Sequence, residues 1–190
     1  MNQQARADHQ ESPVDTYGVM IATDTLRIER LLPGPIERVW SYLTESDKRA
    51  RWLAAGDMDL QVGGIVEHVF RNWELTENDD PPPAKYAEHT GESRMQGRIT
   101  ACEPPYSLAY TWSESAGEYS EVAFELSERG TEVMLVLTHR RLVNREELLG
   151  VSAGWHTHLD ILVDRLSGRT SPGFWRTHTR LEAEYVRRIG

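Results

Sequence analysis

The side chains in this sequence best suited to chemistry are four histidines within predicted strands and helices: His68, His139, His156 and His158. An unperturbed imidazole changes charge between about pH 5 and pH 8, so each of them could act as a general acid or base near neutral pH. The sequence places no catalytic partner beside any of them. We therefore assign no residue a catalytic role and expect that the protein is not an enzyme.

His68 and His139 each occupy an inward-facing position on an otherwise apolar strand face. A buried polar side chain needs a hydrogen-bond partner. Inside a pocket that partner could be a ligand, which the histidine would orient. For His68 the alternative is a strand-end histidine that is satisfied by solvent or by the backbone.

Metal binding and nucleophilic catalysis find little support in the sequence. His156 and His158 flank the apolar stripe of a predicted helix, so they do not face a common metal ion. His156 and Asp160 have a suitable spacing, but no third ligand is near them in sequence. Cys102 has no assignable base and is expected to be a small hydrophobic side chain. Motifs for a hydrolase nucleophile, a phosphate loop or a dinucleotide site are missing from the sequence. We expect no metal and no cofactor.

The longest amphipathic pattern predicts a helix over residues 150–168. Its apolar positions recur at helical spacing and form one face: Trp155, Leu159, Leu162, Val163 and Leu166. Ser152 is the predicted N-cap and Gly168 the predicted C-terminal stop. A separate short helix is expected over residues 144–149, where Asn144 and Glu147 resemble a capping box.

Alternating polar and apolar residues, separated by turn signals, predict a run of antiparallel strands. The expected strands are residues 26–32, 65–71, 95–103, 107–113, 119–126 and 131–141, with turns at 63–64, 115–117 and 129–130. A weaker alternation over residues 17–21 could add a short edge strand. Polar residues on one face of two strands indicate a sheet with one wet and one covered side.

Two short helices are expected after the first strand, one from Pro35 and one over about residues 47–53, and a last helix is expected after Pro172. The predicted organisation is a flexible tail at 1–24, one domain at 25–168 and a helical extension at 169–190. The fold class is α+β: a curved antiparallel sheet of six or seven strands around the long helix. A hollow is expected between sheet and helix.

The bulk composition narrows the class of partner. The chain has 190 residues and a formal net charge of −9, with a pI near 5.3. Nucleic acids and anionic membranes bind preferentially to basic surfaces, so neither is an expected partner of this acidic chain. The chain has one cysteine and no signal-peptide pattern at its start, so a cytoplasmic location is expected.

Several short motifs together resemble the SRPBCC superfamily, whose members have the START-like, helix-grip fold. They are GPIERVW at 34–40, Trp52, Gly63-Gly64, Gly97 before Pro104-Pro105, LAYTW at 108–112, Gly130-Thr131 with THRRL at 138–142, and GWHTHLDILVDRL at 154–166. Within it, residues 25–168 are similar to the branch around the C-terminal domain of the activator of heat-shock-protein-90 ATPase. The segment after Pro172 resembles an extension found in bacterial members.

This resemblance implies the helix-grip fold but leaves the function open, because the superfamily includes lipid carriers, polyketide cyclases, oxygenase subunits and co-chaperones. Three functions are carried forward. The first is an intracellular protein, monomer or homodimer, that binds a small apolar molecule in the hollow. The others are a cavity enzyme with a histidine as acid or base, and a co-chaperone-like module with a chaperone partner.

The residues expected to bind the ligand are those on the inward faces of the strands and the long helix: His68, Phe70, Tyr110, Trp112, Phe124, Leu135, His139, Trp155, His158, Leu159 and Leu162. Trp112 and Trp155 are expected to border the cavity where sheet and helix meet. If Trp155 is buried, its indole N–H needs an acceptor, for which a histidine ring nitrogen would serve.

Overall fold

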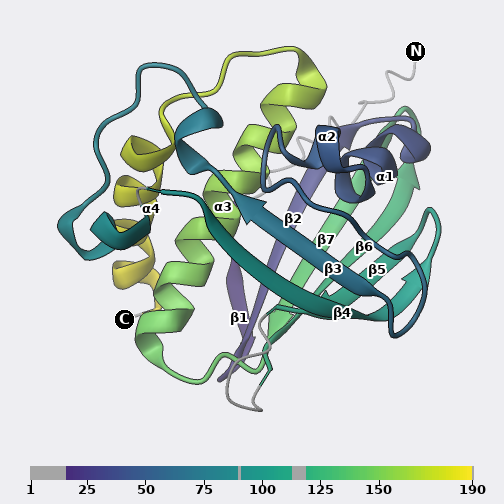
Figure 1. Ribbon diagram of the computed structural model, residues 1–190, viewed down its shortest axis with the longest axis horizontal. Coiled ribbons are helices and arrows are strands. Elements are labelled where there is room, and N and C mark those ends of the chain that lie inside the picture. Colours follow the sequence, from purple (N-terminus) through teal and green to yellow (C-terminus); the bar gives the residue numbers. More distant parts are fainter. Residues whose placement is uncertain (1–15, 90, 113–118, 190) are drawn as a thin grey trace, which may run out of the picture.

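Seven antiparallel strands form a sheet that wraps around one long helix (Figure 1). The computed structural model describes residues 16–89, 91–112 and 119–189. The strands are β1 (Val19–Ala22), β2 (Thr25–Pro33), β3 (Ile65–Phe70), β4 (Ser93–Glu103), β5 (Ser107–Thr111), β6 (Glu121–Arg129) and β7 (Glu132–Arg140). Their order in the sheet is β1-β2-β7-β6-β5-β4-β3. The predicted antiparallel α+β architecture is confirmed.

The helices follow the predicted order. They are α1 (Ile36–Thr44), α2 (Ser46–Arg49), α3 (Arg145–Ser167) and α4 (Phe174–Ile189), with short 3-10 turns η1 (Asn72–Glu74) and η2 (Ala84–His89). The predicted turn at 115–117 lies outside the described residues. None of the helices in the described ranges is both long and apolar enough to span a bilayer.

The long helix starts earlier than predicted. Asn144 caps α3 by accepting a hydrogen bond from the backbone N–H of Glu147, whose own carboxylate accepts one from the N–H of Val143. The expectation of a separate helix ending at Leu149 and of a cap at Ser152 is therefore wrong. Gly150 was expected to begin a new helix, but a glycine inside a helix costs only about 1 kcal/mol and does not break it. At the other end Gly168 has φ +69°, the left-handed stop that was predicted.

The sheet begins before residue 25, where the domain was expected to start. Strand β1 pairs with β2, and residues 1–15 lie outside the described part of the chain. The backbone N–H of Gly18 donates a 2.7 Å hydrogen bond to the hydroxyl of Tyr185 in α4, and Arg30 holds the carbonyl of Thr16. The segment before β1 is thus tied to the C-terminal helix.

The core lies between the concave face of the sheet and α3. Its fully buried side chains come from both: Leu26, Leu32, Leu135, Leu137, Leu159 and Leu162 are 0% exposed. The rotation of α3 against the sheet is set by Trp155, whose indole N–H donates a 2.9 Å hydrogen bond to Nδ1 of His139 on β7. The ring of Trp155 lies 4.7 Å from that of Trp112. The expected burial of Trp155, its contact with Trp112 and its histidine acceptor are confirmed.

Helix α2 is shorter than predicted and ends at Arg49. The guanidinium of Arg49 is fully buried and donates to the carbonyls of Thr44, Ala54, Gly56 and Glu67. These bonds satisfy carbonyls at the end of α1, in the loop after α2 and in β3. The backbone of residues 50–53 therefore turns around the Arg49 side chain and does not continue the helix.

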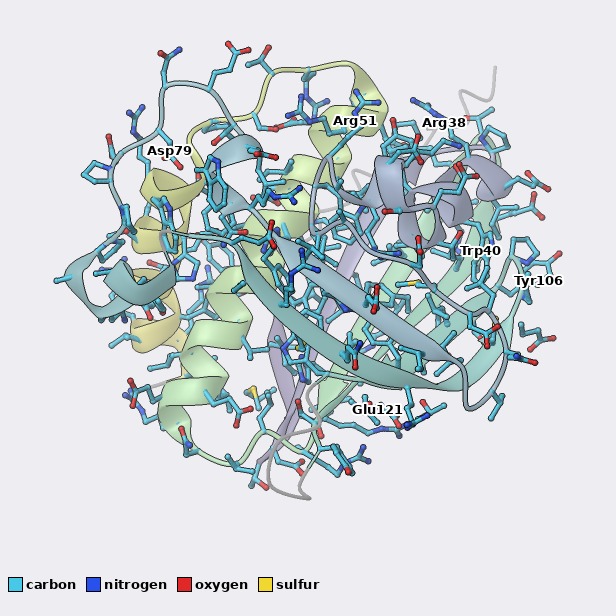
Figure 2. All side chains as sticks on the ribbon, in the orientation of Figure 1. Arg38, Trp40, Arg51, Asp79, Tyr106 and Glu121 are labelled. Atoms are coloured by element: carbon cyan, nitrogen blue, oxygen red, sulfur yellow. The ribbon has the colours of Figure 1, made fainter. Side chains whose placement is uncertain are left out.

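Helix α4 packs on the side of α3 that faces away from the sheet (Figure 1). The loop between β3 and β4 reaches α4 and caps it. Asp79, labelled in Figure 2, accepts hydrogen bonds from the backbone N–H groups of Trp175 and Arg176, and Thr76 accepts one from Phe174. The first turn of a helix has free N–H donors, so this carboxylate fixes loop and helix together.

We expect Trp155→Phe to lower the free energy of unfolding by about 2–3 kcal/mol. The substitution leaves Nδ1 of His139 buried without a donor, which costs about 1–3 kcal/mol, and the smaller ring adds a void. Urea denaturation measures the change. The control is Trp73→Phe, because Trp73 is 45% exposed and should change stability by less than about 0.5 kcal/mol. Equal effects of the two substitutions would contradict the role assigned to Trp155.

Candidate functional site

A pocket of about 280 Å³ lies beside the first half of α3, where the helix, the end of the sheet and α4 meet. Its walls come from β3 and the turn after it, from η2, from the end of β5, and from α3 and α4. The lining residues are Phe70, Asn72, Tyr86, Trp112, Gly150, Val151, Gly154, Trp155, His158, Phe174, Trp175 and His178. This described lining holds no lysine, arginine, aspartate or glutamate.

Aromatic rings form both walls of this pocket, which we call the aromatic pocket. On the sheet side, the ring of Trp112 lies 4.7 Å from Trp155 and 6.1 Å from Phe70. On the α4 side, the ring of Trp175 lies 5.0 Å from Phe174 and stacks on Tyr86 at 5.5 Å. Flat rings facing a cavity from two sides provide apolar, polarisable surface for another flat ring.

Two glycines of α3 keep the pocket open. Gly150 and Gly154 are four residues apart, so they lie one turn from each other on the same face of the helix. A Cβ atom added at Gly154 would meet nothing within 4 Å, and one added at Gly150 would lie 3.6 Å from the Tyr86 hydroxyl. Each glycine costs the helix about 1 kcal/mol relative to alanine. The cavity occupies the space that side chains at these two positions would fill.

His158 continues this face of α3 by one further turn, and its hydrogen bond sets its protonation pattern. Nδ1 lies 2.7 Å from the backbone carbonyl of Trp52. A carbonyl can only accept, so Nδ1 carries the proton. Burial lowers the pKa of His158 to about 4, so the ring is neutral at pH 7. A neutral ring protonated at Nδ1 has a lone pair at Nε2.

His178 on α4 and Asn72 after β3 also contribute polar atoms without partners within the described residues. Nδ1 of His178 and Oδ1 of Asn72 are buried and make no hydrogen bond within the described residues. Burial also lowers the pKa of His178 to about 4. The hydroxyl of Tyr86 donates a 2.8 Å hydrogen bond to Glu182, which also binds Lys85 at the pocket rim.

His68 and His139 lie behind the aromatic wall rather than in the pocket lining. The ring of Trp112 is 5.6 Å from His68 and 5.7 Å from His139. His139 accepts at Nδ1 from Trp155, so its proton is on Nε2, which is buried without an acceptor in the described residues. His68 contacts the Tyr110 hydroxyl at 3.3 Å through Nε2. Burial lowers the pKa of each histidine to about 3.

The structure divides the predicted ligand-binding residues into two groups. Those that line the aromatic pocket are Phe70, Trp112, Trp155 and His158. The others are buried in the core between sheet and α3: His68, Tyr110, Phe124, Leu135, His139, Leu159 and Leu162. That any of them binds a ligand stays a prediction.

Sequence reasoning missed the lining residues that come from the long loop after β3, from α4 and from the glycine-containing face of α3. These residues are Asn72, Tyr86, Gly150, Val151, Gly154, Phe174, Trp175 and His178. The four-residue spacing of Gly150 and Gly154 was a usable signal, since glycine is unfavourable inside a helix. No signal linked Tyr86 to α4, because their contact depends on the path of a long loop.

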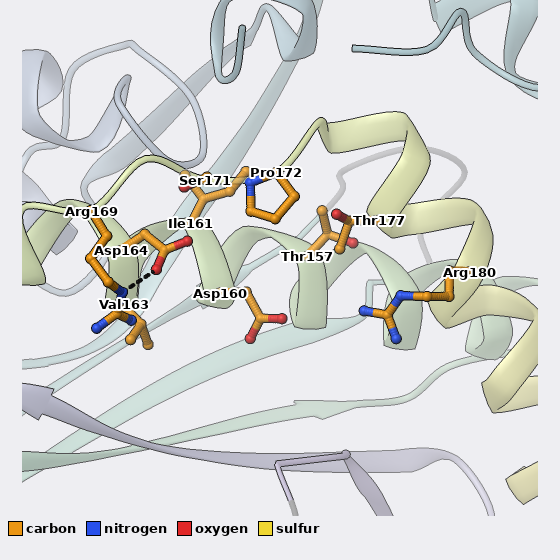
Figure 3. A pocket seen from close by; sticks show the side chains of 10 residues that line it. All are labelled: Thr157, Asp160, Ile161, Val163, Asp164, Arg169, Ser171, Pro172, Thr177 and Arg180. Atoms are coloured by element: carbon orange, nitrogen blue, oxygen red, sulfur yellow. Dashed lines mark hydrogen bonds and ion pairs between the residues drawn. The ribbon is translucent and has the colours of Figure 1, made fainter. Parts of the chain in front are cut away.

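A second pocket of about 240 Å³ lies between α3 and α4, and it is polar (Figure 3). Asp164 on its wall forms a 2.9 Å ion pair with Arg169. Asp160 pairs with Arg30 at 3.0 Å, and Arg180 lines the other side. Burying an apolar molecule among these charges would cost their hydration. Compared with this polar pocket, the aromatic pocket is the better candidate for an apolar ligand. The described residues contain no group of three or more metal-ligating side chains.

Comparisons with known proteins place this geometry in a family. A comparison with curated proteins finds no match. A protein from Bordetella parapertussis with a solution NMR structure is 46% identical over 92% of this chain and 91% of that chain, with a TM-score of 0.76. CalU16 from Micromonospora echinospora is 25% identical over 86% of each chain, with a TM-score of 0.63.

A protein of unknown function from Enterococcus faecalis is 19% identical over 88% of this chain and 86% of that chain, with a TM-score of 0.61, and supports the fold alone. The model of the family described as Activator of Hsp90 ATPase homolog 1-like protein matches residues 33–167. This match covers well over half of the chain and confirms the resemblance found in the sequence. The chain belongs to the family of Activator of Hsp90 ATPase homolog 1-like proteins and has its START-like fold.

Proposed function

We propose that this protein binds a small, neutral, apolar molecule in the aromatic pocket. The observation that carries the proposal is a cavity of about 280 Å³ between two aromatic walls, which α3 keeps open with Gly150 and Gly154. Ligand sites are typically concave and apolar, with a few fixed polar groups. An apolar cavity of about 150 Å³ holds benzene, so this one suits a molecule of one or two rings.

Charge supports a neutral ligand. The described lining has no ionised side chain, and its two histidines are neutral at pH 7 because burial lowers both pKa values to about 4. An anion or cation entering the pocket would lose hydration without gaining a counter-ion.

The same pKa values disfavour the alternative of a cavity enzyme. A general base works best when its pKa lies near the operating pH. His68, His139, His158 and His178 have pKa values of about 3 to 4, well below that range. The co-chaperone alternative rests on family membership alone.

We expect Gly154→Leu to abolish binding of the neutral apolar dye N-phenyl-1-naphthylamine while the protein stays folded. The leucine side chain would project into the open space beside Gly154. Fluorescence titration of the dye measures binding, and thermal denaturation measures the fold.

The matched control is Gly154→Ala, which relieves the same helix penalty and adds only a methyl group. It should raise the free energy of unfolding by up to about 1 kcal/mol and weaken the dye less than leucine does. Unchanged dye binding by a folded Gly154→Leu protein would show that the aromatic pocket is not the binding site.

Stability should fall as the pH is lowered from about 6.5 towards 4. Well above pH 6.5 these histidines are neutral in both the folded and the unfolded protein. As the pH falls through 6.5 the unfolded chain binds protons, whereas His68, His139, His158 and His178 in the folded protein stay neutral until about pH 3 to 4. Each of them contributes up to about 1.4 kcal/mol per pH unit.

Urea denaturation at about pH 7, 6 and 5 tests this dependence. The variant His178→Phe should show a shallower loss between pH 6 and 5 than the wild type, because it removes one of the four groups. A free energy of unfolding that stays constant from pH 7 to 5 would contradict the neutral state assigned to these histidines.

A further inference from the structure

We infer that the aromatic pocket selects ligands that carry a hydroxyl group, held by a hydrogen bond from that hydroxyl to Nε2 of His158. The inference rests on the proposed function and names the chemical class of the ligand: a neutral aromatic hydroxyl compound. The observation behind it is a hydrogen bond to the backbone, which determines which nitrogen of His158 is the acceptor.

The hydrogen bond of His158 to the backbone has a fixed direction. Nδ1 of His158 lies 2.7 Å from the carbonyl oxygen of Trp52, which is itself a fully buried residue. Turning the ring over would place a C–H group against that carbonyl, and moving the proton to Nε2 would place two acceptors together; either change leaves the carbonyl without a donor. Such an unsatisfied buried group is strongly disfavoured. His158 therefore presents an acceptor, never a donor, through Nε2 in its neutral form.

The acceptor nitrogen of His158 is open to the pocket. Nε2 of His158 has no partner among the described residues. It is also not one of the sealed, unpartnered polar atoms, a group that includes Nε2 of His139 and Nδ1 of His178. His158 is a lining residue, and its ring packs against that of Phe174, with 5.0 Å between the ring centres. The lone pair is thus available to a molecule between the aromatic walls.

An aromatic hydroxyl group is the hydrogen-bond donor that fits this acceptor and these walls. Ammonium groups donate, but the described lining offers no carboxylate to balance a buried positive charge. Ethers, ketones and esters only accept, so they would face the lone pair of His158 without a proton between them. A hydroxyl on an aromatic ring is neutral and donates, while its ring matches the walls formed by Trp112, Trp155 and Trp175.

Isothermal titration calorimetry of the wild-type protein at pH 7 with three two-ring probes tests the inference. The probes are 2-naphthol, naphthalene and 2-methoxynaphthalene. We expect 2-naphthol to bind roughly five- to ten-fold more tightly than the other two, the factor expected for one hydrogen bond. Equal affinities for the three probes would overturn the hydroxyl inference and leave the proposed apolar pocket intact. Binding of none of them would overturn both.

Two matched variants then locate the acceptor. His158→Phe and His178→Phe each replace a pocket imidazole by an apolar ring of similar shape. We expect His158→Phe to bind all three probes with similar affinity, and His178→Phe to keep the preference for 2-naphthol. The inference would be overturned if His178→Phe lost the preference for 2-naphthol and His158→Phe kept it, because the acceptor would then be His178. If His158→Phe does not fold, the wild-type probe series still decides the question.

Discussion

The hydrogen bond from Trp155 to His139 is the contact on which the site depends. It joins the long helix to the middle of the sheet and fixes the rotation of α3 about its axis. Once Trp155 faces β7, the neighbouring stripe at Gly150, Gly154 and His158 must face the gap towards α4, because residues four apart share a helix face. If α3 were rotated differently about its axis, larger side chains would fill the gap and the two glycines would face the core.

The sheet and α3 alone would leave this gap as an open notch. Helix α4 covers it with Phe174, Trp175 and His178, and the long loop after β3 adds Tyr86. The cover is held by Asp79, which caps the first turn of α4 from that loop. The segment that resembled an extension found in bacterial members thus supplies three of the twelve lining residues. Residues distant in sequence build the site, and the helix-grip domain alone would lack it.

The sequence predicted the sheet, its hairpins and the apolar face of α3 well, because alternation and helical spacing report burial directly. The start of α3 was missed because Gly150 and Ser152 are more typical of helix ends than of helix interiors. The site was predicted only in part. The sequence pattern alone does not tell whether an inward-facing residue, such as Leu135 or Leu159, fills the core or borders a cavity. Packing decides that distinction, through the side chains that glycines omit and through the path of a loop.

The buried histidines give the site its chemical character. Burial makes the rings poor bases, but it also prevents them from changing partners, so each ring keeps the tautomer that its neighbour imposes. At His139 the neighbour is a donor, Trp155, and at His158 it is an acceptor, the carbonyl of Trp52. Two identical side chains therefore hold opposite patterns: His139 accepts at Nδ1 and His158 donates there. Under the proposed function, fixed and neutral hydrogen-bonding groups would let the pocket discriminate between ligands by the direction of their hydrogen bonds rather than by their charge.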